Sequence, residues 1–198
     1  MIPIIILAAG MSTRYSGGNK LLEKLCGKTV IQRVVEEALK SKVDEVIVVT
    51  GFDAERVREV LKEYNVKIVY NENYAKGMST SVKRGVEVVK DYAEAVVIHP
   101  ADVALISSSD IDAVIDRYRE TRAPIVVASY MGRHGHPILF DRTLFPEILS
   151  IREETLGLKA VKWKYRSRII AVERGLQVLY DIDDVSDMAR ARRMLCKI

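Results

Sequence analysis

The chain has 198 residues, 48% of them hydrophobic and 29% charged, and its formal net charge is +4 at pH 7. This composition is typical of a folded globular protein and argues against an intrinsically disordered chain. The 31 basic and 27 acidic residues are spread along the sequence, whereas nucleic-acid-binding proteins gather basic residues on one face. We therefore expect a single domain over residues 1–198 that binds no nucleic acid. The mild positive charge suits an anionic small substrate as well as a larger partner.

The first seven residues, Met1 to Leu7, are apolar. This run is too short to cross a membrane and has no basic leader before it, so neither a membrane span nor a signal peptide is expected. Cys26 and Cys196 are far apart in the sequence and belong to no metal-ligand pattern. The prediction for them is therefore reduced thiols in a cytoplasmic protein.

Short apolar runs rich in Val and Ile alternate with segments of helical periodicity. Continuous apolar runs are typical of strands buried on both faces of a parallel sheet, and here they occupy residues 4–7, 46–49, 66–70, 95–98 and 125–128. Apolar residues at helical spacing lie over residues 29–40, 54–64, 79–92 and 110–119. This alternation predicts a doubly wound, mostly parallel α/β sheet of Rossmann-like type.

The alternation is weaker after Tyr130. The predicted elements are a turn-rich stretch at 132–137, a helix at 156–164, strands at 168–172 and 176–180, and a last helix at 185–196. Asp183 or Asp184 is expected to be the N-cap of this last helix. The basic residues from Lys159 to Arg168, which include Lys162, are interpreted as a solvated helix face. We interpret the whole segment as a small β-rich C-terminal elaboration of the same domain.

The loop after the first strand, residues 7–22, has the composition of a phosphate-binding loop. It reads LAAGMSTRYSGGNKLL, and its small residues and glycines allow a ligand to approach backbone N–H groups closely. Arg14 can bind a phosphate through two parallel hydrogen bonds, and Lys20 adds a compact charge. The loop matches neither the dinucleotide-binding fingerprint nor the P-loop. The alternative interpretation is a glycine-rich surface turn with two solvated cations.

This loop, together with the Gly27–Val30 step that follows it, resembles the start of the small nucleotidyltransferases. More narrowly, it is similar to the MobA-like NTP transferase family and its molybdenum cofactor cytidylyltransferase-like branch. The resemblance implies that Gly10, Arg14 and Lys20 bind the phosphates of an NTP. It also implies a base pocket lined by Leu7, Ala8 and Ala9.

Residues 71–81 resemble the N-x-x-aromatic-x-x-G-M-S-x-S motif of the same family. Gly77 allows the chain to turn, and Ser79 or Ser81 is expected to cap the next helix. Hydroxyl and free N–H groups at a helix start also bind a base edge or a phosphate. The resemblance implies that Asn71, Gly77, Ser79 and Ser81 bind the nucleotide, whereas capping alone is the alternative role of the two serines.

Aspartates follow two of the predicted strands. Asp102 lies just past the fourth apolar run, at the carboxyl edge of the sheet where ligands bind, and is a candidate Mg²⁺ ligand. Asp181 and Asp183 share one side of an extended chain, so one or both could complete the site. The resemblance implies a metal-binding aspartate at Asp102, although Ala104 replaces the proline of the usual D-x-P. A loop or capping aspartate is the alternative.

The G-H-P sequence at residues 135–137 is a feature of the cytidylyltransferase branch and implies that His136 borders the acceptor pocket. Whether His134 or His136 contacts the substrate stays open. A zinc site is disfavoured because no further Cys or His joins the pair. The family often continues with G-D-x-G, but Glu153–Gly157 lacks that aspartate, which puts the identity of the acceptor in doubt.

The resemblance implies a Mg²⁺-dependent enzyme that transfers CMP from CTP to a phosphorylated acceptor and releases pyrophosphate, with Arg14, Lys20 and Asp102 as catalytic residues. The favoured acceptor is molybdopterin or the molybdenum cofactor, with a molybdoenzyme or its chaperone as a further partner. The alternatives are guanylyl transfer to the same pterin, transfer to another phosphorylated small molecule, and a non-catalytic nucleotide-binding module that delivers cofactor. The base, the acceptor and the oligomeric state stay open at this stage.

Overall fold

The computed structural model describes residues 1–196, and its centre is a seven-stranded sheet in the order β5-β4-β1-β6-β8-β7-β9. The strands of this sheet are β1 (Ile4–Ala8), β4 (Val46–Thr50), β5 (Lys67–Tyr70), β6 (Ala95–Pro100), β7 (Ile125–Tyr130), β8 (Arg133–Asp141) and β9 (Ile169–Glu173). Strand β8 is antiparallel to both of its neighbours, and every other pair is parallel. The predicted mostly parallel α/β sheet is confirmed.

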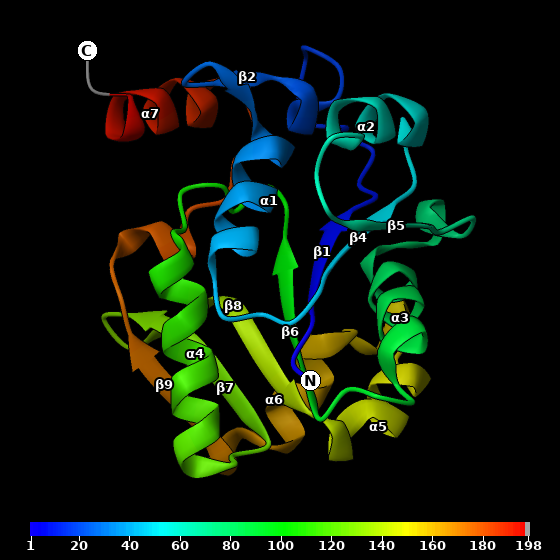
Figure 1. The fold of residues 1–198 in the computed structure, drawn as a ribbon, viewed down its shortest axis with the longest axis vertical. Coiled ribbons are helices and arrows are strands. Elements are labelled where there is room, and N and C mark those ends of the chain that lie inside the picture. The colour runs from blue at the N-terminus through cyan, green and yellow to red at the C-terminus, as the bar shows by residue number, and fades with distance from the viewer. Residues whose placement is uncertain (197–198) are drawn as a thin grey trace.

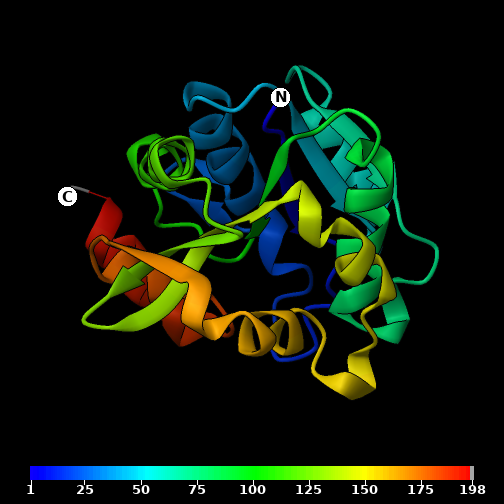
Figure 2. The same cartoon turned by 90° about the horizontal axis from the view of Figure 1, so that it is seen from below.

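Helices cover both faces of the sheet (Figure 1 and Figure 2). One face packs against α1 (Val30–Lys40), α2 (Ala54–Leu61), α4 (Ser108–Thr121) and α7 (Val185–Leu195), and the other against α3 (Met78–Val89), α5 (Phe145–Ser150) and α6 (Leu158–Lys164). Each layer buries its own apolar cluster against the sheet. Within residues 1–196, no helix has both the length and the apolar character needed to span a membrane.

Strand β1 shows why the predicted strands are continuously apolar. Ile4 and Ile6 belong to the apolar cluster beneath α1 and α4, whereas Ile5 and Leu7 belong to the cluster beneath α3. Alternate side chains of a strand point to opposite faces, so a strand covered on both sides has no solvated position. The same alternation determines which residues at the end of β1 face a ligand.

Two predictions about the C-terminal segment are wrong. Residues 176–180 form a 3₁₀ helix, η6 (Leu176–Leu179), whose amides bond to carbonyls three residues earlier, as in Val178 to Gly175 and Tyr180 to Gln177. The stretch 132–137 is part of the β7–β8 hairpin, with a turn at Gly132, where φ is +74°. The C-terminal segment therefore adds strand β9 to the main sheet and is otherwise mostly helical.

The prediction of reduced thiols is also wrong, since Cys26 and Cys196 form a disulfide across a sequence separation of 170. Cys26 lies in the turn between β2 (Lys24–Leu25) and β3 (Lys28–Thr29), and α7 ends just before Cys196. The Arg192 guanidinium of α7 donates two hydrogen bonds to the Lys24 carbonyl, at 2.8 and 3.1 Å. This packing, which the spacing of the cysteines does not reveal, brings the two sulfurs together.

Candidate active site

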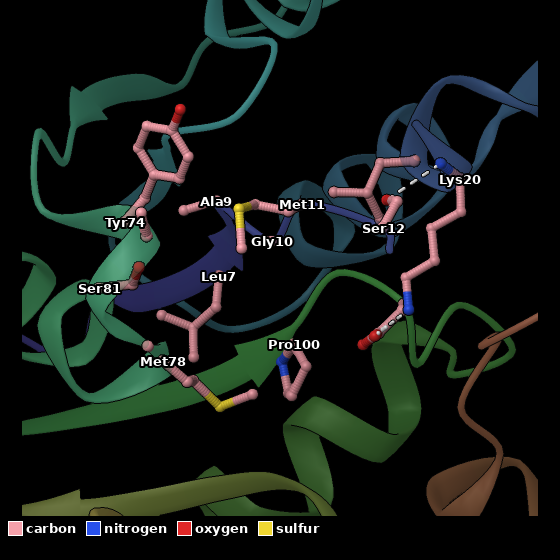
Figure 3. A pocket seen from close by; sticks show the side chains of 14 residues that line it. Leu7, Ala9, Gly10, Met11, Ser12, Lys20, Tyr74, Met78, Ser81 and Pro100 are labelled. Atoms are coloured by element: carbon pink, nitrogen blue, oxygen red, sulfur yellow. Dashed lines mark hydrogen bonds and ion pairs between the residues drawn. The ribbon is translucent and has the colours of Figure 1, made fainter. Parts of the chain in front are cut away.

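A cavity of about 250 Å³ opens at the carboxyl ends of β1 and β6, between the first loop and the β5–α3 connection. Of the residues predicted to bind the nucleotide or metal, those that line it are Leu7, Ala9, Gly10, Lys20, Gly77, Ser81 and Asp102. Figure 3 shows Tyr74, Ser81 and Met78 on one side of Gly10 and Lys20 on the other. Two segments that are distant in sequence therefore enclose one space.

The sequence did not single out the remaining wall residues, which are Met11, Ser12, Leu21, Tyr74, Ala75, Met78 and Pro100. Tyr74 and Met78 lie inside the motif at residues 71–81, so the motif marked the segment but not these side chains. Met78 is 57% exposed, but exposure is a property of the fold, so the sequence held no signal for it beyond its place in the motif.

Three of the residues expected to bind the nucleotide, Ala8, Asn71 and Ser79, are not among those that line the cavity. The Ala8 side chain is buried in the opposite cluster because side chains alternate along β1. Asn71 is buried and donates from Nδ2 to Thr80 Oγ1 at 2.8 Å and to Ser81 Oγ at 3.0 Å. Asn71 therefore holds the first turn of α3 in place from beneath the cavity.

The prediction that Ser79 or Ser81 caps α3 is wrong. The N-cap is Gly77, which has no side chain, and the Ser79 amide donates to Glu153 Oε2 at 2.9 Å. Glycine is favoured at position 77 because its φ is +107°, a backbone conformation that residues with a Cβ rarely adopt. A carboxylate from 74 residues away therefore occupies the anion-binding end of α3.

Four residues named from the sequence form one ion-pair network beside the cavity. Lys20 Nζ lies 2.7 Å from Asp102 Oδ2 and 3.3 Å from Asp183 Oδ1. Arg14 donates two hydrogen bonds to the Asp183 carboxylate, at 2.8 and 2.9 Å. Lys20 is only 12% exposed, whereas Arg14 is 73% exposed. The network thus joins the first loop, the end of β6 and the segment before α7.

Backbone hydrogen bonds fix the positions of these charged groups. The Lys20 amide donates to Ser12 Oγ at 3.2 Å, and Asn19 caps the short η1 helix (Lys20–Leu22) that begins at Lys20. On the other side, the Ile182 amide donates to the Asp102 carbonyl at 3.0 Å. The Asp183 amide in turn donates to Asp187 Oδ2 at 3.0 Å. The charged groups therefore lie on an ordered framework, in which Asp187 has a structural role.

Negative charge is in excess around Asp181. Burial, followed by the charges of Asp102 and Asp183, raises the pKa of Asp181 to about 6. The oxygens of Asp102 and Asp183 already share a cation, the Lys20 ammonium. This all-oxygen donor set suits a hard divalent ion, and Mg²⁺ usually takes one or two carboxylates and completes its shell with water and substrate phosphate. Within residues 1–196, no three-residue metal cluster is preformed.

His136 lies behind the cavity, beside a second histidine. Its ring is edge-on to that of His99, at 6.2 Å between centroids. His99 is fully buried, and its Nε2 lies 3.0 Å from the Val103 carbonyl oxygen. Burial lowers the pKa of His99 to about 4 and that of His136 to about 3, so both rings are neutral at pH 7. The structure brings His136 near Asp102, but His136 does not line the cavity.

The mostly parallel sheet thus brings a cationic, glycine-containing loop and a carboxylate pair together at its carboxyl edge, where ligands bind in open α/β sheets. The family model of the MobA-like NTP transferase domain matches residues 4–168. The chain belongs to this family. It is therefore a nucleotidyltransferase-class protein, as the first-loop motif predicts.

Solved structures share the fold over nearly the whole chain. Rv0371c of Mycobacterium tuberculosis H37Rv superposes with a TM-score of 0.82 at 26% identity, over 97% of both chains. A nucleotidyl transferase of Methanothermobacter thermautotroptrophicus gives 0.83 at 25% identity, over 98% of this chain and 97% of the other. Rv0371c also has a structure in complex with manganese, which matches at 24% identity with a TM-score of 0.78 and covers 98% of this chain and 99% of the other.

Curated relatives resemble only part of the chain. The bifunctional protein GlmU of Prochlorococcus marinus is 28% identical over 130 residues, which cover 65% of this chain and 29% of GlmU. GlmU of Francisella tularensis is 30% identical over 135 residues, which cover 68% of this chain and 29% of GlmU. The chain thus spans less than a third of the length of these relatives, and their likeness is limited to that portion.

Proposed function

We propose that the protein transfers CMP from CTP to a phosphorylated acceptor, molybdopterin or the molybdenum cofactor, and releases pyrophosphate. The observation that carries this proposal is the sharing of the Lys20 ammonium between Asp102 and Asp183 at the edge of the cavity. It joins a phosphate-binding cation to two candidate metal ligands. The sequence resemblance to the cytidylyltransferase branch supports the choice of base and acceptor.

The nucleotide would enter the cavity between the first loop and the start of α3. Gly10 and the backbone around it leave room for phosphate oxygens, because a Cβ at Gly10 would meet no atom within 4 Å. Arg14 and Lys20 would bind the β- and γ-phosphates and stabilise the departing pyrophosphate. The carboxylate of Glu153 at the start of α3 would repel phosphates there, so the triphosphate is expected on the first loop and the base beside Ser81.

Asp102 and Asp183 would hold the divalent ion, with Asp181 as the further carboxylate nearby. Bound there, Mg²⁺ would neutralise charge on the α-phosphate and on the acceptor phosphate. The manganese complex of Rv0371c supports the use of a divalent ion by this fold. Lys20 would exchange its carboxylate partners for nucleotide phosphates when the substrates bind.

The obstacle to the reaction is repulsion between two phosphate groups, about 1 kcal/mol per pair of unit charges at 4 Å in water and several times more in a less polar site. The protein would therefore act by positioning and charge neutralisation. The acceptor phosphate is already ionised at neutral pH, so its oxygen attacks the α-phosphorus without a general base. The bond to the β-phosphate breaks, and pyrophosphate leaves toward Arg14 and Lys20.

A pyrophosphate-release assay tests the proposal and its alternatives together. The protein is incubated with Mg²⁺, each of the four NTPs in turn, and molybdopterin or other phosphorylated acceptors. Release that requires both CTP and molybdopterin supports the proposal, and the product would then pass to a molybdoenzyme or its chaperone. Release with GTP, or with another acceptor, reassigns the substrates. NTP binding without release under any combination indicates a non-catalytic delivery module.

A further inference from the structure

Helix α6 carries a lysine that is turned toward the protein. The helix packs on the core through Val161, which is 1% exposed, and through the partly buried Leu158. Lys162 directly follows Val161 and is partly buried, whereas Lys164 is 63% exposed. The interpretation of this helix face as fully solvated is therefore wrong for Lys162.

Lys162 has no counter-ion in the part of the chain that the structure describes. Two other cations nearby in the sequence do have partners, since Lys164 lies 3.1 Å from Glu147 and Arg166 lies 4.6 Å from the centre of the Trp163 ring. A cation that loses part of its hydration without an ionic partner is destabilised. The position of Lys162 is thus unfavourable unless an anion reaches it from outside the chain.

The titratable groups that interact electrostatically with Lys162 are another lysine and two histidines. Burial, and then the charge of Lys159 three residues earlier, lower the pKa of Lys162. On strand β8, burial and then the charge of Lys162 lower the pKa of His134. The pKa of His136 is likewise lowered, first by burial, then by His99 and then by the charge of Lys162. This cluster of two ammonium groups and two imidazoles carries net positive charge at neutral pH.

The cluster lies on the side of the crevice away from the first loop. Strand β8 pairs with β6 so that Ile138 lies opposite Ile98, which places His136 beside the end of β6, next to the cavity-lining Pro100. A Cβ on Gly157, just before α6, would lie 2.7 Å from Ser79 Oγ, so the start of α6 lies beside the start of α3. Helix α6 is on the same face of the sheet as α3 (Figure 2), and Glu153 just before it reaches the start of α3. Lys162 therefore belongs to the region that the nucleotide would leave free for the acceptor.

We infer that Lys162 and Lys159 form an anion site that binds a phosphate group of the acceptor. This inference rests on the proposed function, because it assigns the acceptor side of the same crevice. A phosphate monoester carries about 1.5 to 2 negative charges at pH 7, which matches two ammonium groups. An acceptor without phosphate would leave the partly buried Lys162 unpaired, so the site selects phosphorylated acceptors, with the exposed Lys159 adding a second positive charge.

A chemical-protection experiment tests the anion site without turnover. Wild-type protein is acetylated at pH 8 while it is titrated with inorganic phosphate, and the modification rate of each lysine is measured by mass spectrometry. The rate at Lys162 is expected to fall at least about threefold once phosphate exceeds about twice its Kd, while the rate at Lys164 stays constant. Equal rates at Lys162 in phosphate and in sodium chloride of equal ionic strength overturn the inference.

Turnover provides the second test. Lys162→Met is expected to raise the acceptor KM about tenfold or more, as for the loss of one charged hydrogen bond, and to leave the NTP KM unchanged. Lys162→Arg should recover most of the affinity, and the control Lys164→Met should behave like the wild type. An unchanged acceptor KM in Lys162→Met overturns the inference. If no NTP and acceptor pair releases pyrophosphate, the proposed function fails, and phosphate protection of Lys162 still decides the anion site.

Discussion

The Ile182 amide donates a hydrogen bond to the Asp102 carbonyl oxygen at 3.0 Å, which joins the end of β6 to the segment before α7. Asp181 and Asp183 flank Ile182 in the sequence, so this bond holds both of them close to Asp102. The carboxylates converge because the backbone that carries them is paired, even though 81 residues separate Asp102 from Asp183. The backbone that carries the candidate metal ligands is therefore ordered, although their side chains form no preformed metal cluster within residues 1–196.

Replacement of Arg14 tests the phosphate-binding role of the first loop. Arg14→Ala is expected to weaken NTP binding and to slow pyrophosphate release by about tenfold or more, because a two-pronged phosphate contact is lost. Calorimetric NTP binding and steady-state rates measure the two effects. Arg56→Ala, which removes an exposed arginine paired with Asp53 on α2, is the matched control. Unchanged kinetics in Arg14→Ala would remove this residue from the site.

The carboxylate of Glu153 is predicted to stabilise the start of α3. Glu153→Ala should lower the free energy of unfolding by about 1 kcal/mol, as for the loss of an N-cap, and should weaken NTP binding because Gly77 and Ser81 lose their support. Glu153→Gln keeps an acceptor oxygen for the Ser79 amide, so it should lose less stability and less NTP affinity than Glu153→Ala. Urea unfolding and NTP titration check both effects. If the two variants have the same free energy of unfolding and the same NTP affinity, the hydrogen bond to the Ser79 amide contributes nothing.

Reduction of the Cys26–Cys196 disulfide is predicted to destabilise the protein. The bond closes a loop with a sequence separation of 170, and the chain-entropy relation gives an upper value of about 5 kcal/mol for a loop of this size. Urea unfolding with and without dithiothreitol measures the difference. A Cys26→Ser, Cys196→Ser variant should have the same free energy of unfolding as the reduced protein, and dithiothreitol should not change it. Overlapping unfolding curves for oxidised and reduced wild-type protein would contradict the prediction.

The buried His99 ring predicts loss of stability in mild acid. Burial lowers its pKa from 6.5 to about 4 in the folded protein, so the unfolded chain binds more protons between these values. The free energy of unfolding is therefore highest above pH 6.5 and falls by about 1.4 kcal/mol per pH unit for this histidine as the pH drops toward 4.

Urea unfolding at pH 7.5 and pH 5 measures this loss. His99→Gln retains an amide donor for the Val103 carbonyl, so it serves as the variant without the titrating group. Between the two pH values, His99→Gln should lose less stability than the wild type. The pH dependence that remains in the variant would include the contribution of His136. An equal fall in both proteins would show that His99 does not titrate as the structure indicates.

The sequence predicts six of the seven strands of the main sheet, all but β8, and most helix boundaries because their causes are local. The runs at β1 and β4 are buried on both faces and hence continuously apolar, and Thr29 with Gln32 forms a capping box at the start of α1. The segment at 176–180 has the composition of a strand, but local bonds of the Val178 and Tyr180 amides form a 3₁₀ helix there. Composition alone does not show whether a neighbouring strand is available.

The candidate site was only partly predictable for a similar reason. Arg14, Lys20, Asp102 and Asp183 belong to motifs, and the fold brings them together. By contrast, the capping of α3 by Glu153 depends on a long-range contact that no local pattern contains. The partial burial of Lys162 likewise depends on how α6 packs against the core, so its sequence looked like an ordinary solvated helix.

Pyrophosphate release by the Asp102→Asn variant tests the central claim most directly, because Asp102 both binds Lys20 and is the proposed metal ligand at the cavity. The assay uses CTP, molybdopterin and Mg²⁺, with Asp116→Asn, an exposed aspartate on α4, as the control. We predict that the wild type and the control release pyrophosphate and that Asp102→Asn is slower by at least about two orders of magnitude while it still binds CTP. Retention of most of the wild-type rate by Asp102→Asn would contradict the account.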